Sequence, residues 1–223
     1  MIDALSLNNA PHPLNFSRFR IQPGHFTVLS GSESALKTLL FQILSGRKPV
    51  EEGSLLLDAS SMEAWSAVAR DRKIAVCEPF RAGSLKVFEV VGLGRLPHVG
   101  NRFSENDEVV VAAAMEWCGI AHFRKRVYET LSDSEQLQVR FARAAAQIWE
   151  RSEMGSRYLL INEPLLDRDD WTRNKIMTLS KELVREMFGI LIALRDAPHN
   201  APFVTHQMSL ENPGTRQRLA YAN

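Results

Sequence analysis

The stretch "GSESALKTLL", residues 31–40, decides the fold of this sequence. It follows "HFTVLS" (25–30), an apolar run rich in residues that favour strands. It leads into "LKTLLFQILSG" (36–46), where apolar residues recur at helical spacing and a glycine marks the helix end. This order of strand, loop and helix is the setting that a phosphate-binding loop requires.

The loop matches the phosphate-binding pattern G-x-x-x-x-G-K-[ST] at every fixed position except one. Gly31, Lys37 and Thr38 fit the pattern, whereas Leu36 stands in place of the second glycine. In such a loop the backbone N–H groups surround the phosphates, the lysine reaches the β- and γ-phosphates, and the threonine holds Mg²⁺. The candidate nucleotide-binding residues are therefore Gly31, Ser32, Glu33, Ser34, Ala35, Leu36, Lys37 and Thr38.

Leu36 leaves two interpretations of this loop open. If position 36 needs dihedral angles that only glycine adopts easily, leucine there costs about 1–3 kcal/mol and weakens nucleotide affinity roughly tenfold or more. In that case Lys37 and Thr38 still provide weak phosphate binding. In the other interpretation the segment is only a turn before a helix, and Lys37 lies in solvent.

Strands and helices alternate along the rest of the chain. Short apolar or alternating runs predict strands, and patterns of helical period predict helices. The expected strands are 15–21 at a sheet edge, 51–58, 73–77, 157–162 and 190–194, and the expected helices are 104–119, 132–149 and 169–189. The pattern from about 80 to 130 is helical throughout. We therefore expect an α/β fold with a mostly parallel core sheet and a helical subdomain between its two halves.

Composition and charge exclude several classes of protein. The formal net charge of +1 argues against a nucleic-acid partner, and 45% hydrophobic with 24% charged residues is typical of a globular protein. The longest apolar stretch, "VVVAAAM" (109–115), is too short to enter a bilayer, and the first residues carry no export signal. Cys77, Cys118 and the histidines lack metal-ligand spacing. We therefore expect a cytoplasmic protein with no metal centre and no direct membrane insertion.

Four stretches, in order along the chain, resemble the motifs of the ATP-binding subunits of ABC transporters. They are the loop around Lys37, "LSDSEQLQVRFARAAAQIW" (131–149), "RYLLINEP" (157–164) and "ILIALRD" (190–196). Two further stretches, "VVGLGRLPH" (90–98) and "ARAAAQIW" (142–149), look most like the haemin and iron-complex import branch. The resemblance covers roughly residues 1–197.

The resemblance implies a P-loop NTPase fold with a mostly parallel core sheet, an antiparallel N-terminal β part and a helical subdomain. Residues 1–223 then form one domain: 1–78 and 157–197 make the α/β core, about 79–156 the helical subdomain with the signature helix, and 198–223 a short surface tail. It also implies an ATP-binding subunit attached to a permease in the inner membrane through the helical subdomain. Such subunits dimerise around ATP, here as a homodimer or as a heterodimer with another ABC ATPase.

The second stretch corresponds to the signature segment of the family, and its candidate residues are Ser132, Asp133, Ser134 and Glu135. In the family this segment contacts the γ-phosphate of ATP held by the opposite subunit, and Asp133 and Ser134 replace its two glycines. Two like charges 4 Å apart repel by about 1 kcal/mol in water and about 4 kcal/mol at the dielectric constant of a protein surface. The same residues also form a helix capping box, with Ser132 three residues before Glu135.

The third and fourth stretches correspond to the magnesium and catalytic strand and to the switch strand. Asn162 replaces the family's aspartate, which makes Thr38 and Asn162 a weak Mg²⁺ site because Mg²⁺ prefers charged oxygens. Glu163 stands at the position of the general base that activates water, although a glutamate at a strand end can also be simply solvated. Arg195 takes the place of the switch histidine and, being always protonated, cannot accept a proton.

Two more positions complete the comparison with the family. Pro79 stands where the γ-phosphate-sensing glutamine is expected, and Asp169 matches the aspartate of the D-loop. With several positions altered around one Mg·ATP, the sequence predicts an ABC-type importer subunit with a degenerate phosphate loop, weak Mg·ATP binding and impaired or lost ATP hydrolysis. Two alternatives remain: a working ATPase of the same class, and a non-catalytic regulatory or interaction protein on the same scaffold.

Overall fold

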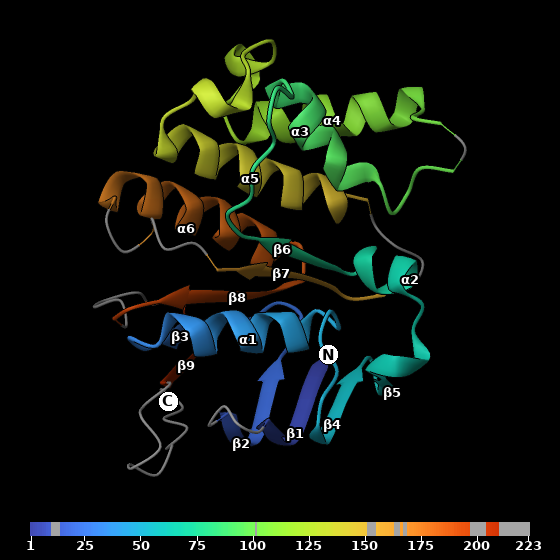
Figure 1. Cartoon of the computed structure of the whole chain (residues 1–223), viewed down its shortest axis with the longest axis vertical. Coiled ribbons are helices and arrows are strands. Elements are labelled where there is room, and N and C mark those ends of the chain that lie inside the picture. The colour runs from blue at the N-terminus through green and yellow to red at the C-terminus, as the bar shows by residue number, and fades with distance from the viewer. Residues whose placement is uncertain are drawn as a thin grey trace.

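The computed structural model of this chain describes residues 1–9, 14–100, 102–150, 155–162, 166, 169–196 and 204–209. Figure 1 shows the layers of the fold: helices above, a core sheet in the middle, one helix beneath that sheet, and a second sheet at the bottom. Within the described residues, each helix is too short or too polar to cross a membrane.

The core sheet has the strand order β6-β7-β8-β3-β9, and each pair of neighbouring strands is parallel. Its strands are β3 (Phe26–Ser30), β6 (Ile74–Cys77), β7 (Arg157–Ile161), β8 (Phe188–Leu194) and β9 (His206–Ser209). β6, β7 and β8 are buried along their whole length, as expected for parallel strands covered on both faces. The predicted α/β fold with a parallel core sheet is confirmed.

The second sheet is antiparallel and has the order β2-β1-β4-β5. Its strands are β1 (Ile2–Asn9), β2 (Leu14–Ile21), β4 (Glu52–Leu57) and β5 (Ser60–Ser61). β2 lies at the edge, as its sequence predicts. β1 is central and was not predicted, although Ile2 and Ala4 alternate with Asp3 in the period of a strand.

The helices lie on both faces of the core sheet (Figure 1). They are α1 (Ser34–Leu44), α2 (Ala67–Asp71), α3 (Val87–Gly92), α4 (Glu105–Trp117), α5 (Asp133–Gln147) and α6 (Asp170–Arg185). α1 lies between the two sheets, α5 and α6 cover the opposite face of the core sheet, and α3 and α4 pack outside α5. Short 3₁₀ turns occupy residues 62–64, 93–95, 121–123 and 128–130.

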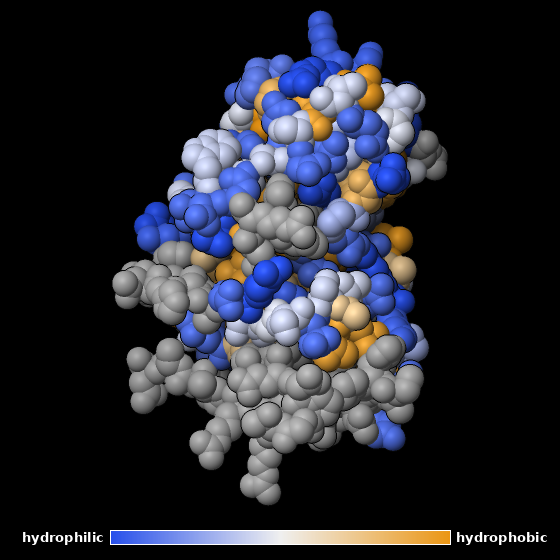
Figure 2. All heavy atoms as spheres, turned by 60° about the vertical axis from the view of Figure 1, so that its left-hand side comes forward, coloured by the Kyte–Doolittle hydropathy of each residue, from blue (hydrophilic) through white to orange (hydrophobic). Residues whose placement is uncertain are grey.

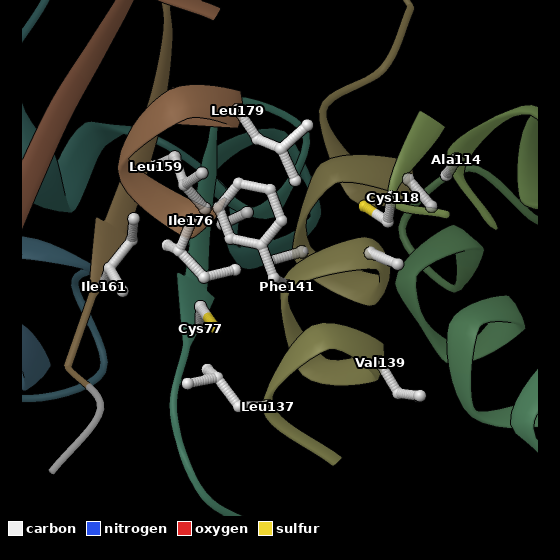
Figure 3. Packing of buried hydrophobic residues seen from close by; sticks show 14 of the residues in the cluster. Cys77, Ala114, Cys118, Leu137, Val139, Phe141, Leu159, Ile161, Ile176 and Leu179 are labelled. Carbon is white, nitrogen blue, oxygen red and sulfur yellow. The ribbon is translucent and has the colours of Figure 1, made fainter. Parts of the chain in front are cut away.

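Two hydrophobic clusters hold these layers together. The larger one lies between the core sheet and α3 to α6, and the other joins α1 to both sheets. Figure 3 shows α5 packed on two sides: Phe141 points toward Ile176 and Leu179 of α6, whereas Val139 lies on the side of α4. Because α5 is surrounded in this way, its first residues are fixed relative to both the outer helices and the sheet.

Two residues of "VVGLGRLPH", Gly94 and Arg95, lie in a turn that packs tightly against α5. A Cβ atom on Gly94 would lie 2.2 Å from the carbonyl oxygen of Arg143, so only glycine lets this turn approach α5. The next residue, Arg95, is 1% exposed, and its guanidinium donates to Asp107 Oδ1 at 2.9 Å and to the Ala146 carbonyl at 2.9 Å. Gly94 and Arg95 thus join the outer helices to the end of α5.

The expected surface tail needs correction. Residues 206–209 form β9, which pairs in parallel with β3, and Met208 is 6% exposed. The pairing is supported by Thr205, whose hydroxyl accepts from the Phe26 N–H at 2.9 Å. Part of the segment that was predicted to lie on the surface therefore completes the edge of the core sheet.

Candidate functional site

The predicted phosphate loop lies where β3 ends, at the carboxyl edge of the core sheet. Gly31 directly follows β3 and has a φ of 151°, a value that favours glycine. Its N–H donates to the carbonyls of Leu194 (3.2 Å) and Arg195 (2.9 Å) at the end of β8. The loop is therefore fastened to the neighbouring strand, at the edge where parallel α/β sheets bind ligands.

Leu36 is accommodated in a different way from the strain considered above. α1 begins at Ser34, so Leu36 already lies in the helix, and it is not one of the described non-glycine residues with positive φ, which are Asp58, Ala59 and Met187. Its side chain is 8% exposed and belongs to the hydrophobic cluster beneath the core sheet. The expected glycine-only dihedral strain at position 36 is thus absent, and the leucine contributes to the core.

Lys37 is held inside the loop. Its side chain is 7% exposed, and Nζ donates to the Gly31 carbonyl at 2.9 Å and to the Leu194 carbonyl at 3.2 Å. The interpretation that placed Lys37 in solvent is therefore wrong. The ammonium lies at the base of a helix start whose outer residues are exposed, namely Ser32, Glu33, Ser34 and Ala35. A buried cation beside the positive end of a helix favours an anionic ligand.

The two predicted metal ligands are in direct contact. Asn162 follows β7, and its Nδ2 donates to Thr38 Oγ1 at 3.1 Å, while its backbone N–H donates to the Cys77 carbonyl at 2.9 Å. The Thr38 oxygen that would coordinate Mg²⁺ therefore already accepts an N–H. An amide donor at this point opposes a cation, whereas a carboxylate would attract one.

The other residues predicted for this edge are only partly described. Glu163, the predicted general base, lies outside the described residues. Arg195 follows β8 and is exposed, and its backbone carbonyl accepts the Gly31 N–H. Pro79 is exposed after β6, and the preceding Glu78 forms an ion pair with Arg47.

The predicted signature segment is the start of α5, and its capping box is present. Ser132 is the N-cap, its Oγ accepts from the Glu135 N–H at 3.3 Å, and Glu135 Oε2 accepts from the Ser132 N–H at 2.8 Å. The backbone N–H of Ser132 is the main reason that the pKa of Glu135 is lowered. Asp133 is exposed in the first turn, where a carboxylate is favourable.

Ser134 joins the signature segment to α6. Its hydroxyl donates to Asp169 Oδ2, and the same carboxylate caps α6 by accepting from the Thr172 N–H at 3.0 Å and from the Thr172 hydroxyl at 2.7 Å. The hydrogen bond from Ser134, followed by those from Thr172, lowers the pKa of Asp169 to about 2. Sequence reasoning noted Ser134 and Asp169 separately and missed that they bind each other.

The phosphate loop and the signature segment do not meet within one chain. α1 and α5 lie on opposite faces of the core sheet (Figure 1). Figure 2 shows the face near their first residues as mostly hydrophilic, with separate apolar patches. In the described part of the chain, His, Cys, Asp and Glu side chains form no group of three that could hold a metal ion.

Comparison with known proteins gives one family and several similar sequences. The family profile described as "ABC transporter" matches residues 14–150. The hemin import ATP-binding protein HmuV of Gloeobacter violaceus is 31% identical over 176 residues, covering 78% of this chain and 64% of that protein. The protein of the same name from Pseudomonas aeruginosa is 32% identical over 196 residues, covering 86% of this chain and 74% of that protein. This chain thus spans just under two thirds of the Gloeobacter protein.

Solved structures support the fold alone, because their identities are low. An inward-facing structure of a metal-chelate type ABC transporter has a TM-score of 0.78 at 16% identity and covers 96% of this chain and 80% of that chain. A dimeric bacterial ABC transporter cassette has a TM-score of 0.76 at 20% identity and covers 94% of each chain.

Proposed function

Because this chain belongs to the ABC transporter family, we propose that it is the ATP-binding subunit of an importer for haemin or another iron complex, with impaired or lost ATP hydrolysis. It would act beside a membrane permease, on the cytoplasmic side of the inner membrane. The names of the similar proteins support the importer class. The observation that carries the impairment is the contact between the Asn162 amide and Thr38 Oγ1.

Binding of the ATP phosphates is supported by the loop. The buried Lys37 ammonium, the start of α1 and the exposed residues 32–35 form a setting for an anion at the carboxyl edge of the sheet. Leu36 does not oppose this role, since its side chain packs away into the core. The chain's own residues would therefore position the phosphates.

The donor set fits Mg²⁺ poorly. A magnesium site prefers carboxylate and other hard oxygens, but Asn162 offers Thr38 an N–H and brings no charge. A bound Mg²⁺ would normally neutralise charge as the γ-phosphate is transferred. Arg195, at the switch position, remains protonated and cannot take the proton of an attacking water. These features together support binding of nucleotide without efficient hydrolysis.

Dimerisation around ATP is also expected to be weak. The Ser132 hydroxyl accepts from the Glu135 N–H and donates to Glu135 Oε2, so it is already engaged at its own helix start. Asp133, exposed beside it, would face the negative γ-phosphate of a partner subunit. In a heterodimer with an intact ABC ATPase, the phosphate loop of this chain would meet an intact signature segment, whereas the partner's phosphate loop would meet the altered segment at Ser132 and Asp133.

The test is calorimetric titration of the purified chain with ATP, with and without Mg²⁺, together with an assay of phosphate release. Lys37→Met is the matched control because it removes the ammonium and keeps the length of the side chain. We expect weak ATP binding that depends on Lys37, changes less than about threefold with Mg²⁺, and yields no phosphate release above the Lys37→Met background.

A working ATPase of the same transporter class is the second candidate, favoured by the unstrained Leu36 and the positioned Lys37. Phosphate release that needs Mg²⁺ and is abolished by Lys37→Met would establish this candidate and overturn the proposed impairment. If millimolar ATP produced no heat in either protein, the nucleotide role would be refuted in favour of a regulatory or interaction protein.

A further inference from the structure

A second pocket lies at the opposite end of the core sheet from the phosphate loop. It has a volume of about 410 Å³ and is lined where α4, α5 and α6 end and where β7 and β8 begin. Trp117, Trp149 and Phe188 form its aromatic walls. The volume is within the range of small-molecule sites, which combine apolar walls with a few polar groups. The proposed nucleotide function makes no use of this pocket.

The two indoles meet at an angle and leave ring surface at the pocket. The ring centroids of Trp117 and Trp149 are 5.8 Å apart, with planes at 72° to each other, and both side chains are half-buried. Trp117 is also stacked on Phe141 of α5, which fixes its orientation from behind. Two nearly perpendicular aromatic walls are the geometry with which proteins hold organic cations.

Two carboxylates, those of Glu182 and Glu186, line the pocket together with the guanidinium groups of Arg157 and Arg185. Glu182 is exposed on α6, and its Oε2 accepts from Trp117 Nε1 at 2.8 Å, which places the carboxylate beside the indole. Glu186 is exposed one turn further along. The C-terminal ends of α4 and α6 also lie here and carry a partial negative charge, whereas the carbonyls at the end of α5 are bound by Arg157.

One of the two arginines of the pocket is committed to the protein. Arg157 is 8% exposed, donates to the carbonyls of Ile148 (3.2 Å) and Trp149 (3.1 Å), and stacks 3.8 Å from the centroid of Phe188. It therefore stabilises the end of α5 and forms part of the floor. Arg185 is exposed in the last turn of α6, at the rim.

We propose that this pocket binds an organic cation, an alkylammonium or guanidinium group, in the corner formed by the Trp117 and Trp149 rings, with Glu182 as its counter-ion. The cation would come either from a free small molecule or from a side chain of another protein. Both sources share the chemistry of a weakly hydrated positive group against aromatic rings and a carboxylate.

The test uses tryptophan fluorescence in a Trp65→Phe/Trp171→Phe background, in which only the two pocket indoles report. Choline and N-acetylarginine amide are titrated as the two cation probes, with 3,3-dimethylbutan-1-ol as the neutral isostere of choline and benzoate as an anion. We expect saturable changes in tryptophan fluorescence with the two cations and none with the neutral isostere or benzoate. Trp149→Leu and Glu182→Gln should each weaken binding about tenfold. Glu116→Gln, at an exposed position of α4 outside the pocket, should leave the affinity for the cations unchanged.

The outcomes separate support from refutation. Saturation by choline identifies a free quaternary ammonium as the fitting ligand, and saturation by the arginine probe alone identifies a protein side chain. Binding of the neutral isostere or benzoate as tightly as choline would overturn the proposal, as would equal binding by Glu182→Gln. If Trp149→Leu fails to fold, Trp149→Phe, which retains a ring, should keep the affinity within about threefold. The ATP titrations above do not depend on these results.

Discussion

The starts of α1 and α5 each carry a side chain where the motifs predicted from the sequence have a glycine, and they accommodate it in different ways. At α1, Leu36 turns into the hydrophobic cluster under the core sheet. At α5, the half-buried Ser134 donates to Asp169, the N-cap of α6. One replacement stabilises the protein by burial and the other by a hydrogen bond.

Both residues show that a side chain at a predicted ligand-contacting glycine position can stabilise the structure. Each substituted residue has acquired a structural role, so restoring the glycine would remove a stabilising contact. The two roles also differ in size, since burial of a leucine side chain contributes several times more than one partly buried hydrogen bond.

The largest effect is expected from Leu36→Gly. Removal of a buried leucine side chain costs about 2–5 kcal/mol and a glycine inside a helix about 1 kcal/mol, so the free energy of unfolding should fall by about 3–6 kcal/mol. Urea denaturation measures this. Val109→Gly, at a position 64% exposed in α4, is the control for the helix term alone and should cost about 1 kcal/mol. Equal losses in the two variants would show that Leu36 is not part of the core.

The next effect concerns the metal site beside α1. Asn162→Asp removes the N–H that Thr38 Oγ1 accepts and supplies a carboxylate, so Mg²⁺ should strengthen ATP binding about tenfold in this variant. Calorimetric titration with and without Mg²⁺ measures the ratio. Asn162→Ala removes the same N–H without adding charge. If Mg²⁺ strengthened ATP binding by Asn162→Ala as much as binding by Asn162→Asp, the missing carboxylate would not explain the weak Mg²⁺ binding that we propose.

At α5, the contribution of the Asp169 hydrogen bonds to stability should depend on pH. The pKa of Asp169 in the folded protein, about 2, lies below the ordinary value of 3.8, so its hydrogen bonds stabilise the fold above about pH 4 and are lost as the pH falls toward 2. After allowance for solvent screening, Asp169→Asn should cost about 1–1.5 kcal/mol at pH 7 and almost nothing near pH 2. Urea denaturation along a pH series measures the difference. Asp170→Asn, one residue further along α6, should not reproduce this pH dependence.

The smallest effect is expected from Ser134→Gly. The variant loses the hydrogen bond to Asp169, and we expect a destabilisation of about 0.5–1 kcal/mol by urea denaturation. Ser134→Ala separates the hydrogen bond from the added backbone freedom of glycine. A loss as large as that of Leu36→Gly would contradict the distinction between the two helix starts.

Much of the fold could be predicted from the sequence because its central elements are long and periodic. The buried runs of β7 and β8 and the helical patterns of α5 and α6 lie within about four residues of their predicted bounds. β9 could not be predicted, because "HQMS" has little strand character of its own and pairs only with β3 at the sheet edge.

The site was predicted in position but not in its contacts. One face of α1 carries an apolar stripe formed by Leu36, Leu39, Leu40 and Ile43. The helical period that identified the helix therefore also predicts the burial of Leu36. In contrast, Ser134 and Asp169 are separated by 35 residues, and no local pattern records such a pair. The hydrogen bond from the Asn162 side chain to Thr38 Oγ1 likewise depends on the tertiary arrangement of β7 beside α1.

The place of β3 in the core sheet has a consequence for how the protein is made. β3 is made well before both of its neighbours in the core sheet, because Phe26 pairs with Ile190 of β8 and Thr27 pairs with His206 of β9. At about 5–20 residues per second, the apolar strand waits roughly 10–30 s for its first partner. The phosphate loop therefore cannot be completed until β8 has been made, and until then β3 is an unpaired strand open to mispairing and to chaperones.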